Sequence, residues 1–186
     1  MPFRHGGVGQ RVHMNIPEGL NYVKIELYCS LMFVATHVTM GALVGQNAAT
    51  PELAFCLGVA SHFLLDIIPH GDSQLYYDYK AGIGGAKSIA YPAIDSAIAV
   101  ILFIYLLQTA PYASRSVMVA GVIGSIFPDF LVALGEGVRI HPLRWFQRLH
   151  IRIHDAIVSR VGNISLRAGI FMQLILLFTM IYIVKR

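Results

Sequence analysis

Five apolar stretches recur along the chain, and they constrain its fold more than any other feature. They cover residues 27–44, 52–68, 88–107, 117–134 and 166–184. The third and fifth reach the ~20 apolar residues that a helix needs to cross a bilayer core, whereas the others are shorter and carry His or Asp, so they could instead be re-entrant or interfacial. Backbone groups in lipid must be paired internally, so whatever spans is helical. The sequence predicts an all-α integral membrane helical bundle with about four or five transmembrane helices.

Composition supports a membrane protein. Charged residues make up 13% of the 186 residues and hydrophobic residues 56%, whereas a soluble domain is ~25% charged. Cys29 and Cys56 both lie in apolar stretches, so the sequence predicts no disulfide framework and no thiolate zinc site. The length predicts a single helical membrane domain over 31–186. Residues 1–30 are interpreted as an N-terminal extension, and they show no secretory signal.

The distribution of positive charge predicts the orientation. If every stretch spans and the sides alternate, eleven Lys and Arg fall on one side and three on the other. Basic loops stay in the cytoplasm, so the basic side is predicted to be cytoplasmic. The segment 135–167 supplies six of the eleven, so the bias depends on it. Small side chains in two of the stretches predict close helix packing: Gly41, Ala42, Gly45, Gly121, Gly124 and Ser125.

The run SHFLLDIIPHGD is the densest signal for chemistry. His62 and Asp66 are four residues apart and therefore share one face of a helix. Pro69 ends that helix, and His70 and Asp72 follow it at once. Imidazole and carboxylate are ligands that suit zinc and similar divalent ions. A His62–Asp66 hydrogen bond that reaches the membrane interface explains the pair equally well, so both interpretations stay open.

Three more polar residues lie in apolar stretches. His37, Asp95 and Asp129 would each, taken alone, be explained as buried and hydrogen-bonded residues, and Pro128 kinks the chain beside Asp129. In the alternating topology, however, all three lie in the same half of the membrane as the His62 group. A shared ion would require that convergence, whereas independent polar residues would scatter.

The segment 141–157, HPLRWFQRLHIRIHDAI, predicts an amphipathic helix that lies on the membrane with its arginines toward anionic lipid. His150 and His154 are four apart and could face the site as ligands, as supports for the ligands or as a proton shuttle. The basic residues are explained by orientation and lipid, so no nucleic-acid partner is expected. No glycine-rich run has the spacing of a phosphate-binding loop.

The order THxxxG, SHFLLDxxPHxD, GSxxPD and HxxxH over residues 32–155 resembles the membrane-bound metal-dependent hydrolases. These are small inner-membrane proteins related to the LexA-binding hydrolase family. The His-x-x-x-Asp pair with its following Pro and His is also similar, more weakly, to zinc-dependent phospholipase C and related zinc nucleases. The chain departs from the family after Asp129, where Phe130 and Leu131 follow, and it has no His-Arg-Gly run. The resemblance implies an inner-membrane protein with five metal ligands: His37, His62, Asp66, His70 and Asp129.

Together these features predict a metal-dependent hydrolase at the cytoplasmic face, with an ester or phosphoester as substrate and a phospholipid as one candidate. The cofactor is expected to be a divalent metal, with zinc favoured. Asp95 or Asp72 would accept the proton from the attacking water. A non-catalytic membrane scaffold or partner-binding protein with paired His and Asp is the alternative. An ion carrier is disfavoured because the outer half of each stretch is apolar, and the oligomeric state is left open.

Overall fold

The computed structural model describes residues 33–68, 85–111, 114–138, 141–161 and 164–186, and within these ranges it contains helices and no strand. The all-α prediction is therefore confirmed for this part of the chain. The predicted extension, 1–30, lies outside the described residues. The helices are α1 Val34–Asn47, α2 Pro51–Leu65, α4 Gly85–Thr109, α5 Arg115–Val138, α6 His141–Val161 and α7 Leu166–Val184.

The predicted number of four or five transmembrane helices is too high. Among the described residues, three helices are long and apolar enough to cross a membrane, at Ala90–Thr109, Arg115–Gly135 and Leu166–Val184. Helices α1 and α2 have 14 and 15 residues. At 1.5 Å per residue they are about 21–23 Å long, short of the ~30 Å hydrocarbon core. The turn between α1 and α2 ends α1, and the turn after Leu65 ends α2, so neither helix reaches spanning length.

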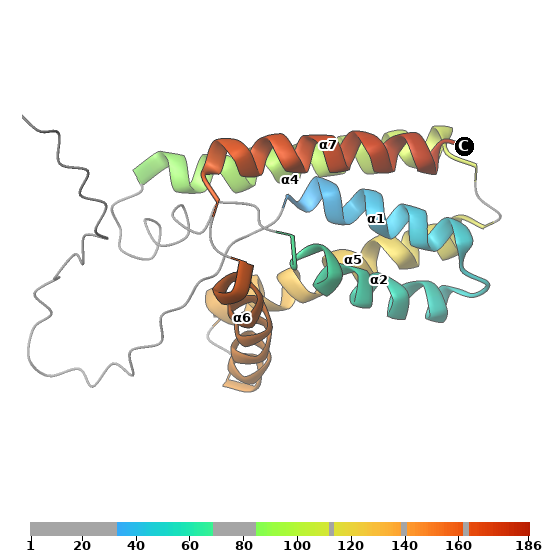
Figure 1. The fold of residues 1–186 in the computed structure, drawn as a ribbon. Helices are drawn as coiled ribbons and strands as arrows, with labels where there is room; N and C mark the ends of the chain where they lie inside the picture. Colours follow the sequence, from blue (N-terminus) through green and yellow to red (C-terminus); the bar gives the residue numbers. More distant parts are fainter. Residues whose placement is uncertain (1–32, 69–84, 112–113, 139–140, 162–163) are drawn as a thin grey trace, which may run out of the picture.

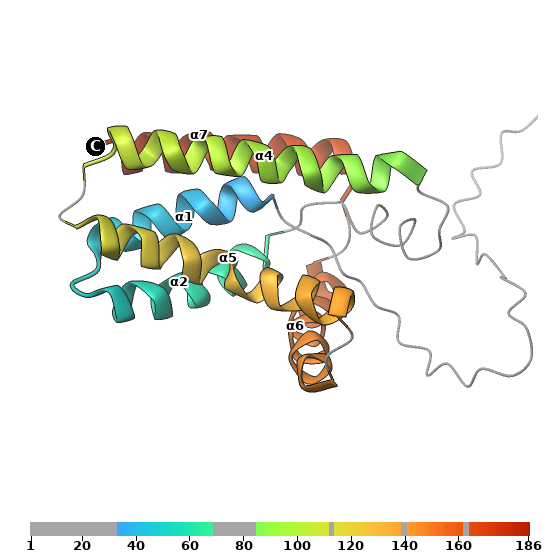
Figure 2. The same ribbon diagram turned by 180° about the vertical axis from the view of Figure 1, so that it is seen from behind.

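Helix α1 lies in the middle of the bundle, with α4 and α7 on one side and α2 and α5 on the other (Figures 1 and 2). Helices α1, α4 and α7 run in one direction along the bundle, and α2 and α5 run in the opposite direction. The N-terminal ends of α1, α4 and α7 and the C-terminal ends of α2 and α5 therefore lie toward the same end (Figure 1). Helix α6 lies at this end beside the C-terminal end of α5 and runs crosswise to the other helices in both views.

Glycines allow α5 to pack backbone to backbone against α1 and α2. A Cβ added to Gly41 would lie 2.7 Å from Gly121 O, and one added to Gly45 would lie 2.7 Å from the Met118 Cα. A Cβ added to Gly58 of α2 would overlap the Gly121 carbonyl in the same way. This is the close approach that small residues permit between membrane helices. The fold thus holds α1, α2 and α5 in a fixed register.

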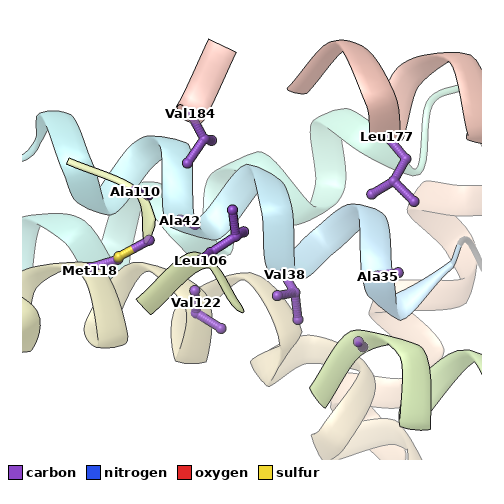
Figure 3. Packing of buried hydrophobic residues seen from close by; sticks show 10 residues of the cluster. Ala35, Val38, Ala42, Leu106, Ala110, Met118, Val122, Leu177 and Val184 are labelled. Atoms are coloured by element: carbon purple, nitrogen blue, oxygen red, sulfur yellow. The ribbon is translucent and has the colours of Figure 1, made fainter. Parts of the chain in front are cut away.

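A cluster of buried apolar side chains ties α1 to α4, α5 and α7. It runs along most of the length of α1 (Figure 3). The members labelled in Figure 3 are Ala35, Val38, Ala42, Leu106, Ala110, Met118, Val122, Leu177 and Val184. This cluster makes the side of α1 toward α4 and α7 largely apolar, whereas the buried His37, His62 and Asp66 lie toward the end beside α6.

Candidate metal centre

Three imidazoles and two carboxylates meet beside α6. They come from four helices: His37 from α1, His62 and Asp66 from the end of α2, Asp129 from α5 and His150 from α6. His62 and Asp66 share one helix face, as their spacing of four predicts. The structure therefore brings together residues that lie more than a hundred positions apart in the sequence.

Asp66 is the centre of the cluster. Its Oδ1 lies 3.3 Å from His37 Nε2, and its Oδ2 lies 3.1 Å from His62 Nε2 and 3.6 Å from His150 Nε2. Asp129 closes the other side, with Oδ1 3.6 Å from His62 Nε2 and 3.8 Å from His150 Nε2. The His37 and His62 rings stack with centroids 4.3 Å apart. All three Nε2 atoms therefore face the two carboxylates.

The backbone of α5 fixes the ring of His62. Its Nδ1 lies 2.8 Å from the Ser125 carbonyl oxygen, to which it can donate a hydrogen bond. That bond keeps the proton on Nδ1 and leaves the Nε2 lone pair directed at the cluster. Pro128, inside α5, has no N–H to donate to the carbonyl oxygen of Gly124, the residue before Ser125. The Ser125 hydroxyl donates to the His37 carbonyl oxygen at 2.7 Å, so one residue supports two of the histidines.

The three histidines and Asp66 are buried, and several of the imidazole nitrogen atoms have no hydrogen-bond partner among the described residues. Within the described part of the chain, Nε2 of His37 and Nε2 of His62 have no hydrogen-bond partner, although carboxylate oxygens lie close to both. A buried polar atom left in this state costs about 1–3 kcal/mol. Imidazole nitrogen and carboxylate oxygen atoms that lie this close without a hydrogen bond between them have the arrangement expected of ligands of one metal ion.

The distances suit such a centre. Four ligands at about 2.0–2.1 Å from a tetrahedral zinc would lie about 3.3–3.4 Å from one another. The measured separations between the Nε2 and Oδ atoms are 3.1–3.8 Å. Two overlapping triads have suitable donors, His37 with His62 and Asp129, and His62 with Asp66 and His150. These buried groups could hold a divalent metal ion.

His150 lies close enough to Asp66 and Asp129 to be a metal ligand itself, and not only a residue that orients the ligands. Its Nε2 is at the same kind of distance from Asp66 and Asp129 as the other ring nitrogens, and its side chain is 4% exposed. Burial lowers the pKa of His150 and so favours the neutral imidazole, the form that binds metal. His154 lies on the same helix, but its side chain is outside the described residues, as are His70 and Asp72.

Asp95 is placed differently from its predicted role. Its Oδ2 accepts a hydrogen bond from Val34 N at 2.6 Å and its Oδ1 accepts one from Ala35 N at 3.4 Å. Gln173 of α7 accepts from Phe33 N at 2.7 Å. The N-cap residue of α1, Phe33, makes no side-chain cap of its own. The polar residues of α4 and α7 therefore supply the cap that the local sequence lacks.

Two residues that support the site are missing from the sequence-based set. The sequence-based predictions include Ser125 only as a small residue for close packing, and they do not include Gln173, a single amide in an apolar helix. A buried polar residue in a membrane helix is nevertheless costly without a partner, and that is the signal that could have identified Gln173. Comparison with known proteins returned no match to any family model, any curated protein or any solved structure.

Proposed function

We propose that this protein is a membrane-embedded hydrolase that uses a divalent metal, with zinc favoured by the donor set. The observation that carries the proposal is the convergence of three imidazole Nε2 atoms and two carboxylates at 3.1–3.8 Å, with no hydrogen-bond partner among the described residues for Nε2 of His37 and His62. Imidazole and carboxylate without thiolate is a set common in catalytic zinc sites. The resemblance of the sequence to membrane-bound metal-dependent hydrolases points the same way.

A bound divalent ion would lower the pKa of a water molecule and polarise an ester or phosphoester. The residues of the chain supply the rest. Asp66 is 5% exposed, whereas the side chain of Asp129 is 21% exposed. Water and substrate therefore reach the cluster from the side of Asp129. This carboxylate is placed to complete the ligand set through Oδ1 and to accept the proton of the attacking water, which then passes to the leaving oxygen.

The substrate class follows from the location of the site. The cluster includes Asp129, from the last third of a helix that is long and apolar enough to cross a membrane, and the amphipathic helix α6 contributes His150 to it. A phospholipid or another amphiphilic ester can bring its headgroup to that depth while its chains stay in lipid. We assign the predicted base Asp95 to anchoring α1, because both of its oxygens already accept hydrogen bonds from the α1 backbone.

The first test is metal content. The chain is purified in detergent and its bound metals are measured by elemental mass spectrometry, beside His62→Ala and Asp66→Ala. Glu52→Gln is the matched control, because it removes an exposed carboxylate at the N-terminus of the same helix α2. We expect about one metal per chain in the wild type and in the control, and none in the two site variants.

The second test is turnover. Metal-loaded protein is assayed on a chromogenic carboxylic ester, on a phosphodiester and on fluorogenic phospholipids, with Asp129→Asn as the inactive comparison. Metal binding without turnover on any of them would overturn the hydrolase and leave a metal-binding protein. Wild-type protein that stays empty after incubation with zinc, manganese or iron would favour a scaffold in which His37–Asp66 and His62–Asp66 act as ion pairs.

A further inference from the structure

Helix α6 has three distinct faces, and the bundle uses only one of them. His150 and Ile151 are buried, which marks the face toward α5 and the site. At about 100° per residue, Arg144, Arg148 and Arg152 lie about 120°, 160° and 200° around the helix from His150, and all three are exposed. The arginines are therefore directed away from the metal cluster, and the chemistry of that cluster does not explain them.

The third face of α6 is apolar and also open. Trp145 is 64% exposed and Leu149 is 39% exposed. On a helix these residues lie one turn apart and form a strip between the arginine row and the buried face. A helix with one packed face, one exposed apolar strip and one cationic row has the pattern of a helix that lies in a membrane interface.

The position of α6 agrees with that pattern. It runs crosswise to the three helices that are long and apolar enough to span, beside the C-terminal end of one of them, α5 (Figures 1 and 2). Its own 21 residues are about 31 Å long, enough to span, but its arginines keep it out of the apolar candidates. Among the side chains that the structure describes, no carboxylate forms an ion pair with Arg144, Arg148 or Arg152.

We propose that the arginine row of α6, Arg144, Arg148 and Arg152, binds the headgroups of anionic phospholipids, with Trp145 and Leu149 seated at the boundary between headgroups and acyl chains. Guanidinium groups pair well with phosphate oxygens. The row is about 12 Å long from the first arginine to the last, enough to reach more than one headgroup. The proposal does not depend on catalysis.

Trp145 is the only tryptophan in the chain and reports on α6 alone. The full chain is reconstituted in nanodiscs of phosphatidylcholine, either pure or mixed with phosphatidylglycerol, and quenching of Trp145 by lipids brominated in the upper acyl chain is measured. We expect stronger quenching with phosphatidylglycerol, and we expect salt to remove that gain because screening weakens exposed charge pairs. The number of phosphatidylglycerol molecules retained by the detergent-solubilised protein is counted by native mass spectrometry.

The variant R144Q/R148Q/R152Q tests the row, and R115Q/K185Q/R186Q removes the same charge at the opposite end of the bundle. Each arginine near an anionic surface contributes about five-fold to affinity, so we expect the first variant to lose the phosphatidylglycerol-dependent quenching and the second to keep it. Equal quenching in both lipid mixtures, or an unchanged response in the first variant, would overturn the proposal. If the triple variant fails to fold, the salt titration of the wild type still tests the same charge-dependent binding, because it needs no substitution.

Discussion

Replacing Asp95 by Asn separates the two roles that this carboxylate could have. In the structure its oxygens hold the first turn of α1 by accepting hydrogen bonds from Val34 N at 2.6 Å and Ala35 N at 3.4 Å. His37 lies in that same turn and is the only group that α1 contributes to the metal cluster. If Asp95 anchors α1, its loss must loosen His37. If Asp95 is the catalytic base, its loss must stop turnover and leave the cluster intact.

The magnitude follows from the two hydrogen bonds. Asn keeps one acceptor oxygen and loses the negative charge, so the short bond is weakened and the longer one is lost. A lost helix cap costs about 0.5–2 kcal/mol, and hydrogen bonds to charged groups fall in the upper part of the usual range. For a chain of this size each kcal/mol lowers the melting temperature by about 2–4 °C. We therefore expect Asp95→Asn to melt about 2–8 °C lower than the wild type.

Gln173→Leu is the matched comparison. Gln173 holds the same helix end through Phe33 N at 2.7 Å, and its neutral amide cannot act as a base. We expect Asp95→Asn and Gln173→Leu both to lower the melting temperature and to weaken zinc binding in a competition titration against a chelating dye. If Asp95→Asn binds zinc and melts like the wild type but hydrolyses no substrate, the anchoring role is wrong and Asp95 is the base.

Three further outcomes test the packing and the metal. Gly121→Ala should be about 1–3 kcal/mol less stable than Gly135→Ala. An added Cβ at Gly121 meets backbone atoms at 2.9 Å, whereas one at Gly135 meets nothing closer than the Leu143 Cβ at 3.1 Å. Equal melting temperatures of the two variants would contradict this expectation. Thr50→Ala removes the side-chain cap of α2, so stability should fall by about 1 kcal/mol with zinc affinity unchanged, since Thr50 lies at the end of α2 far from the cluster. Removing zinc with a chelator should lower the melting temperature, because free zinc at 100 times its Kd stabilises the folded state by about 2.7 kcal/mol. An unchanged melting temperature would mean that zinc does not bind the folded state.

The sequence predicts much of the candidate site because its strongest clue is local. The spacing of His62 and Asp66 places both on one helix face without any knowledge of the fold. The alternating topology then places His37 and Asp129 at the same end of the bundle, and the structure brings all four together. What topology cannot supply is the angle at which α6 returns to the bundle. The sequence therefore predicts His150 beside the site without a fixed role, and its distance to Asp66 comes from the structure alone.

Asp95 shows that the depth of a residue in the membrane does not by itself define its role. The sequence places it at the same depth as the cluster, and that placement holds, because it binds the start of the helix that carries His37. The N-terminal end of a helix, however, has unpaired N–H groups that also attract a carboxylate. Phe33 precedes α1 and cannot cap it through a side chain, so the need for a partner from another helix is visible in the sequence at the boundary of α1. The described residues contain fewer helices of spanning length than predicted for a related reason, since hydropathy does not show where a short apolar helix ends.

The distribution of polar and apolar groups along α1 bears on what the cluster can do. An ion path through the bundle would need polar groups to continue along the helix. Beyond His37, the buried face that α1 presents to α4, α5 and α7 is lined by Val38 and Ala42, which belong to the apolar cluster of Figure 3. Thr39 is buried as well, but its hydroxyl donates to the Ala35 carbonyl oxygen of its own helix. Among the described residues, this face of α1 therefore carries no continuous row of polar groups beyond His37, as an ion path would need.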